Sequence, residues 1–101
     1  VAARARQCEA WGVDMIYLHY GADQRRADAT RDSVQWLLET QKAVKIPIGV
    51  GTFGVEDAVR AVSMGAELVA IGHPVISGEK PLEAMRDYVQ KVRAAYRPRP
   101  A

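Results

Sequence analysis

Apolar residues recur at a helical spacing in four stretches of the chain. The first, "VAARARQCEAWG", ends at Gly12, and the second covers roughly 31–43. In the third the apolar positions follow the i, i+3, i+4, i+7 rule, with acidic residues in the first turn and Gly65 beyond the end: Val55, Ala58, Val59 and Val62. The fourth begins at Pro81 and carries one apolar stripe: Leu82, Met85, Val89, Val92 and Tyr96. The pattern predicts four helices.

Three short runs between these helices are apolar at successive positions, namely 15–18, 46–50 and 68–71. They are partly β-branched or aromatic and are bounded by glycine, which is typical of strands. Because successive residues of a strand point to opposite faces, both faces of these strands are expected to be covered. The order helix, strand, helix, strand, helix, strand, helix predicts an α/β fold with a parallel sheet and helices outside it.

An internal repeat supports this order. "GVDMIYLH", from Gly12 to His19, aligns with "GAELVAIG", from Gly65 to Gly72, glycine on glycine, acid on acid and apolar run on apolar run. Each segment is interpreted as a glycine that ends a helix, a short turn and a strand. His19 and Gly72 then fall at the C-terminal ends of parallel strands, where α/β folds bind their ligands.

Composition narrows the class of protein. With 101 residues, 49% hydrophobic and 26% charged, the chain suits one globular domain. The net charge of +2 is made of interspersed signs, which gives no reason to propose nucleic acid or a membrane surface as partner. A single cysteine, Cys8, and the lack of a signal-peptide pattern or a long apolar run lead us to expect a cytoplasmic protein. Because the chain opens on Val1 inside a helical pattern, we also expect that residues preceding it are missing.

Two glycine-containing loops follow consecutive predicted strands. They are "GVGTFG", with Gly51 and Thr52, and "IGHPVISG", with Gly72 and His73. A glycine at a strand end lets the backbone approach a ligand and present N–H groups, and each loop leads toward a helix N-terminus that favours anions. One such loop is more often ordinary turn chemistry, but the consecutive pair predicts a phosphate clamp like that after the seventh and eighth strands of βα barrels.

These motifs resemble those of the orotidine-phosphate decarboxylase suprafamily of barrels, within it the hexulose-6-phosphate synthase and 3-keto-L-gulonate-6-phosphate decarboxylase branch. The pattern H-x-G-x-D is present as His19, Gly21 and Asp23. A glycine pair is matched by Gly51, with Thr52 in the second place. The resemblance covers nearly the whole chain. It implies that residues 1–97 are the C-terminal βα units, with the last three strands, of a TIM (β/α)8 barrel, and that 98–101 form a tail.

The resemblance also implies roles for individual residues. His19 would move a proton or polarise the substrate, and Asp23 would orient His19 or a substrate hydroxyl. The phosphate would be held mainly by backbone N–H groups of four residues: Gly51, Thr52, Gly72 and His73. The implied reaction joins formaldehyde to ribulose 5-phosphate, or the reverse, through a metal-stabilised enediolate. The decarboxylase reaction is the enzymatic alternative.

Parts of that family's machinery are missing from the sequence. Its Mg²⁺ and proton-transfer groups come from earlier strands, notably an Asp-x-Lys-x-x-Asp motif that does not occur here. Three strands cannot close a barrel and would expose apolar faces and strand edges. We therefore expect the isolated chain to be inactive and its partners to be a phosphorylated sugar and the missing barrel strands. The resemblance also implies a homo-oligomer, because barrels of this family are typically homodimers. The alternative is a non-catalytic partial barrel that associates with copies of itself. A third possibility, an open flavodoxin-like sheet, would need more strands.

Simpler roles exist for most of these residues. His19 could be satisfied by a backbone carbonyl, and Asp23 could face solvent. A solvated or interfacial face explains Arg25 and Arg26 without a substrate, and His73 followed by proline could form a rigid turn. Aromatic and sulfur-containing side chains on the helical patterns are expected in the core or on a partner surface: Trp11, Trp36, Met64 and Met85.

Overall fold

Helices and strands alternate along the computed structural model, which describes residues 1–19, 27, 33–72 and 75–99. The elements are α1 (Ala2–Ala10), β1 (Ile16–Leu18), the 3₁₀ helix η1 (Ser33–Trp36), α3 (Leu37–Ala43), β2 (Ile48–Gly51), α4 (Val55–Ser63), β3 (Leu68–Ala70) and α5 (Pro81–Ala95). This is the predicted order, although the second helix starts as a 3₁₀ turn within the described part. None of the helices in the described ranges is long and apolar enough to cross a membrane.

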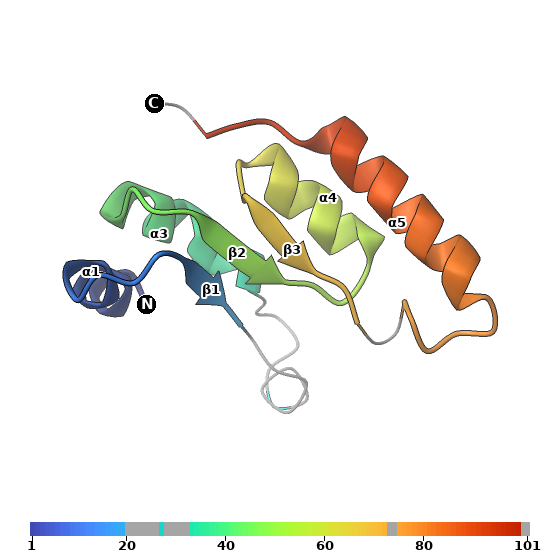
Figure 1. Ribbon diagram of the computed structural model, residues 1–101, viewed down its shortest axis with the longest axis horizontal. Coiled ribbons are helices and arrows are strands. Elements are labelled where there is room, and N and C mark those ends of the chain that lie inside the picture. Colours follow the sequence, from blue (N-terminus) through green and yellow to red (C-terminus); the bar gives the residue numbers. More distant parts are fainter. Residues whose placement is uncertain (20–26, 28–32, 73–74, 100–101) are drawn as a thin grey trace.

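The strands form one parallel sheet in the order β1-β2-β3 (Figure 1). Leu18 pairs with Val50, and Val50 pairs with Val69, so the three strands run in register. Each crossover between neighbouring strands passes through a helix, as parallel pairing requires. The C-terminal ends of all three strands therefore lie at one edge of the sheet.

The core lies between the sheet and the helices. Ile48 and Val50 of β2 are fully buried and pack with Leu37 of α3 and Ala61 of α4. Leu18 of β1 is also buried in this cluster. Because β2 is the central strand, its two inward side chains are the best protected residues of the sheet, and their burial fixes the position of the strand end that follows them.

The opposite face of the sheet is exposed, although the apolar runs taken alone predicted cover on both faces. Tyr17 of β1 and Leu68 of β3 are 47% and 44% exposed. On β2 this face carries glycines at 49 and 51, and the side chains of Met15 and Leu68 reach the space above Gly49. The buried side chains of β1 and β2 all point to the helical face. The described helices therefore cover one face of the sheet, and the other face is exposed, as expected of three strands that cannot close a barrel.

The predicted apolar stripe of α5 is also not its buried face. Leu82, Met85 and Val89 are 62%, 40% and 41% exposed, whereas Tyr88 is buried at 4%. The helix packs on α4, and the side chains it turns inward are rotated by about one residue from the stripe. The buried face of α5 thus carries a tyrosine where the pattern predicted an aliphatic side chain. Its hydroxyl group needs a hydrogen-bond partner inside the protein.

The repeat seen in the sequence is a repeated helix end. Gly12 has φ +90° and Gly65 has φ +99°, both in the left-handed region that favours glycine. After α1, Val13 N–H donates to Cys8 C=O and Gly12 N–H to Glu9 C=O.

After α4, the N–H groups of Ala66 and Gly65 donate in the same way, to the carbonyls of Ala61 and Val62. Both ends are Schellman motifs, and each reverses the chain into the next strand.

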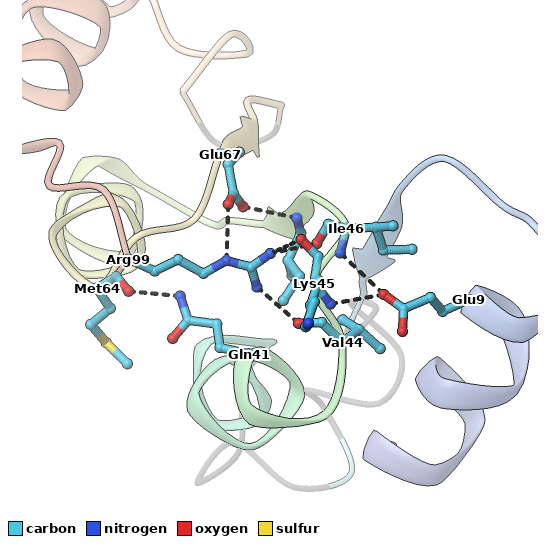
Figure 2. A network of polar contacts seen from close by, with 9 residues as sticks. Glu9, Gln41, Val44, Lys45, Ile46, Met64, Glu67 and Arg99 are labelled. Atoms are coloured by element: carbon cyan, nitrogen blue, oxygen red, sulfur yellow. Dashed lines mark hydrogen bonds and ion pairs between the residues drawn. The ribbon is translucent and has the colours of Figure 1, made fainter. Parts of the chain in front are cut away.

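After α5 the chain runs along the N-terminal edge of the sheet to Arg99, and residues 100 and 101 of the predicted tail lie outside the described residues. The guanidinium group of Arg99 donates hydrogen bonds to the carbonyls of Val44, Lys45 and Ile46 (Figure 2), two of them at 3.3 Å (Val44) and 2.9 Å (Ile46). Its Nε lies 3.4 Å from Oε1 of Glu67. Arg99 therefore joins the residues that precede β2 to those that precede β3.

Two glutamates complete this network at the N-terminal edge of the sheet. Oε2 of Glu9 accepts hydrogen bonds from the N–H groups of Lys45 at 2.8 Å and Ile46 at 3.2 Å. Oε2 of Glu67 accepts from the N–H of Ile48 at 2.9 Å. Backbone groups that enter β2 are thus bound by side chains from α1, from the start of β3 and from the C-terminal segment.

Candidate functional site

The C-terminal edge of the sheet brings together residues that are far apart in the sequence. His19 directly follows β1, Gly51 ends β2, and Gly72 lies two residues beyond β3. The strand register places Gly51 opposite Ala70 and the residue after Leu18 beside Gly51. We call the edge formed by the C-terminal ends of the strands, with His19, Gly51, Thr52 and Gly72, the upper rim, although the strands point downward in Figure 1. These four predicted site residues therefore share one edge of the sheet.

His19 and Tyr17 lie together over the end of β2. Their rings stack with centroids 5.9 Å apart and planes at 18°. A Cβ atom built on Gly51 would stand 2.7 Å from the Tyr17 hydroxyl oxygen and 3.2 Å from His19 Nδ1. Both rings can therefore lie across β2 only because residue 51 has no side chain. As a result, the exposed imidazole of His19 lies beside the backbone of the first glycine loop.

The hydroxyl group of Thr52 already makes two hydrogen bonds within the protein. The Oγ1 atom donates to the carbonyl of Ala70 at 2.8 Å, and it lies 2.7 Å from the hydroxyl oxygen of Tyr88. Since a threonine hydroxyl has one proton, and that proton points to Ala70, Tyr88 is the donor in the second contact. A phosphate at this loop would therefore be bound by backbone N–H groups rather than by the Thr52 hydroxyl proton.

Tyr88 is a residue that the sequence reasoning missed. Burial raises the pKa of its hydroxyl above the ordinary value. The hydroxyl also lies 3.5 Å from the Ala70 carbonyl. The sequence offered one signal for it: Tyr88 lies beside the predicted apolar stripe, on the helix that follows the second glycine loop. Its hydroxyl group could therefore have been expected to reach a polar partner near that loop.

Gly72 is half-buried, and the position that a side chain would take there is open among the described residues. A Cβ atom built there would meet no described atom within 4 Å. Its carbonyl accepts a hydrogen bond from the Ile76 N–H at 3.2 Å, which turns the chain after β3. An anion could approach the backbone here without displacing a side chain of the described residues, as the clamp hypothesis requires.

Comparison with known proteins identifies the fold. No protein-family model matches the chain, and no curated protein matches it. Among solved structures it is similar to the crystal structure of 3-hexulose-6-phosphate synthase from Salmonella typhimurium, with a TM-score of 0.82 and 24% identity. The match covers 94% of this chain and 45% of the synthase. The fold is part of a TIM barrel.

The similarity confirms the predicted fold class, an α/β arrangement with parallel strands and helices outside the sheet. It also explains the uncovered face, because the concave side of such a barrel is filled by side chains from all eight strands. This chain spans less than half the length of the synthase. Tyr17 and Leu68 thus occupy the face that would point into the barrel.

Several predicted residues cannot be placed. Gly21, Asp23, Arg25 and Arg26, and likewise His73 with its following proline, lie outside the described residues. The catalytic role of Asp23 and the phosphate contact of His73 stay predictions. Within residues 1–19, 27, 33–72 and 75–99, no group of three or more His, Cys, Asp or Glu side chains could hold a metal ion. The described residues do not form the Mg²⁺ site that the family resemblance implies.

Proposed function

We propose that this chain is the phosphate-binding part of a sugar-phosphate aldol lyase or synthase barrel resembling hexulose-6-phosphate synthase. The observation that carries the proposal is the meeting of an exposed histidine and two glycine loops at one rim, with His19 Nδ1 3.2 Å from the Cβ position of Gly51. Parallel α/β sheets bind ligands at this end of their strands. The similarity to a synthase structure supports the same choice of substrate class.

In the proposed complex the backbone N–H groups of the two glycine loops bind the phosphate of ribulose 5-phosphate. Gly72 leaves room for the anion among the described residues, and His73 would add a further N–H. His19 then faces the sugar end of the substrate. As the C–C bond forms between the enediolate carbon and formaldehyde, the formaldehyde oxygen becomes an alkoxide, and the His19 imidazolium gives it a proton. Cleavage of the product runs the same step in reverse.

The proposed enzyme needs strands that this chain does not supply. Tyr17 and Leu68 are about half exposed on the face that points into a barrel, and β1 and β3 are the edge strands of the sheet. Exposed apolar faces and free strand edges favour association. We propose that the remaining strands of a barrel cover this face in a cytoplasmic enzyme, and that self-association replaces them when the chain is alone. Sedimentation of the isolated chain tests the second part, since a monomer contradicts it.

A pair of glycine substitutions tests the phosphate site. Gly72→Ala places a methyl group in the open space where the anion is proposed to lie, and we expect about a tenfold loss of affinity for ribulose 5-phosphate, the scale of one hydrogen bond to a charged group. Gly12→Ala is the control, because a Cβ there also meets no described atom within 4 Å and Gly12 lies before β1, at the opposite edge of the sheet; its φ of +90° makes this variant less stable without changing either glycine loop. Isothermal titration of both variants and of the unchanged chain gives the comparison.

The proposal predicts that only Gly72→Ala weakens binding. Equal affinities for both variants would show that the second loop does not contact the phosphate. Absence of binding to the unchanged chain would contradict the proposed site itself, because all of the proposed phosphate contacts lie within this chain.

A further inference from the structure

The hydroxyl group of Thr52 lies where β2, β3 and α5 meet. It donates to Ala70 C=O, two residues before Gly72, and accepts from Tyr88 of α5. The main-chain ladder ends at the pair Gly51 and Ala70, so this side-chain bond is the next connection between the strands beyond that pair. It connects the first glycine loop to the last residue of β3, two residues before Gly72.

Tyr88 holds this connection from the helical side. Its side chain is buried against α4 and the sheet, and a buried hydroxyl without a hydrogen bond is costly. Its oxygen lies 2.7 Å from Thr52 Oγ1 and 3.5 Å from the Ala70 carbonyl, so the well-formed bond is the one to Thr52. The rotation of α5 about its axis is thereby tied to the position of Thr52.

We propose that the Tyr88–Thr52 pair is a positioning device that sets the distance between the two glycine loops, and so the affinity of the upper rim for phosphate. This inference rests on the proposed function, since it concerns the same phosphate site. Neither side chain donates to the anion. The hydroxyl pair acts through the backbone of Thr52 and of the segment from Ala70 to Gly72, whose N–H groups must converge on one phosphate group to bind it together.

The alternative is that the pair only stabilises the fold. Both roles predict a lower unfolding temperature when a hydroxyl is removed, so stability alone does not separate them. They differ in the phosphate affinity of the molecules that remain folded. A positioning role lowers that affinity, whereas a role in stability alone leaves it unchanged.

The experiment measures the phosphate affinity of folded protein by following amide NMR signals during titration with inorganic phosphate. Tyr88→Phe removes the donor and keeps the ring in place, and Thr52→Val removes the hydroxyl and keeps the shape. Thr52→Ser retains the hydroxyl and serves as the conservative variant. Glu67→Gln is a control at the opposite edge of the sheet, where it weakens the Arg99 ion pair without touching the loops.

We expect Tyr88→Phe and Thr52→Val each to weaken phosphate binding by about three- to tenfold, the scale of one hydrogen bond. The double variant should bind no more weakly than Thr52→Val alone, because the two changes remove the same bond. Thr52→Ser should retain the affinity. Glu67→Gln should lower the unfolding temperature and leave the affinity unchanged.

Two results would overturn the inference. If Tyr88→Phe lowers the unfolding temperature while the folded protein binds phosphate as before, the pair is structural, and the proposed function survives through the effect of Gly72→Ala. If Tyr88→Phe and Thr52→Val weaken binding additively, the two side chains act independently of each other, and the hydrogen bond between them does not position the loops. A chain that binds no phosphate in any form refutes the proposed function together with this inference.

Discussion

The two ends of the three-stranded sheet use their polar groups in opposite ways. At the N-terminal end, which we call the lower rim, Arg99, Glu9 and Glu67 bind the backbone groups that enter β2. At the upper rim the imidazole of His19 is exposed and Gly72 faces open space among the described residues. At the lower rim, side chains of the same chain bind these backbone groups, whereas the upper rim leaves room for a ligand among the described residues. This division between stability and binding is the one known for the two faces of TIM barrels.

Glycines show the same contrast. Gly65 at the lower rim has a φ of +99°, and a Cβ there would stand 2.7 Å from the backbone nitrogen of Arg99. At the upper rim a Cβ on Gly51 would meet the ends of the Tyr17 and His19 side chains. Backbone cannot move aside cheaply, whereas partly exposed rings can. The glycine of the lower rim is required by the fold, and that of the upper rim is required by the arrangement of the site.

The largest expected effect is at the lower rim. Arg99→Ala removes the hydrogen bonds to three carbonyls and the contact with Glu67, so we expect a loss of about 2–4 kcal/mol in the free energy of unfolding. Arg99→Lys keeps the charge but lacks the planar fork of donors that reaches the three carbonyls and Glu67 together, and should recover only part of the loss. Urea unfolding followed by circular dichroism measures both. Stability equal to that of the unchanged chain would show that the C-terminal segment is not anchored.

A second comparison exchanges the two glycines for alanine. We expect Gly65→Ala to destabilise by about 1–3 kcal/mol, because of its positive φ and the close backbone of Arg99. Gly51→Ala should cost less stability but separate Tyr17 and His19, seen as loss of the nuclear Overhauser contacts between their rings. If Gly51→Ala unfolds the protein as readily as Gly65→Ala, the distinction between the rims fails.

Much of this arrangement could be predicted from the sequence, for physical reasons that differ between elements. The strand positions and the parallel sheet followed from apolar runs, and the repeated helix ends followed from Gly12 and Gly65, because backbone conformation and burial are local constraints. The convergence of His19 with Gly51 and Gly72 followed from parallel pairing. These inferences needed no knowledge of individual side-chain contacts.

The rest depended on contacts between distant residues. The contacts of Arg99 could not be predicted, because nothing in a short basic segment reveals that carbonyls 53 to 55 residues earlier will accept its hydrogen bonds. Tyr88 was overlooked because the apolar stripe of its helix was off by one position from the face that packs. The exposed sheet face, by contrast, was expected from the sequence, because three strands cannot close a barrel.

The smallest expected effect concerns pH. Because burial raises the pKa of Tyr88 in the folded protein, its contribution to stability is complete below the ordinary tyrosine pKa and is lost as the pH rises through the higher folded value. The unchanged chain should therefore lose stability more steeply above about pH 10 than Tyr88→Phe does. Unfolding curves from pH 8 to 11, a range chosen around the ordinary value of about 10, test this. Parallel curves for the two proteins would contradict a buried, protonated Tyr88.

The central claim is that phosphate binds at the upper rim and not at the lower one. Titration of the ¹⁵N-labelled chain with ribulose 5-phosphate tests it residue by residue through amide chemical shifts. The account predicts shifts centred on Gly51, Thr52 and Gly72, with Lys45 and Ile46 unaffected. Shifts centred on Lys45 and Ile46, or no shifts at either rim, would contradict it.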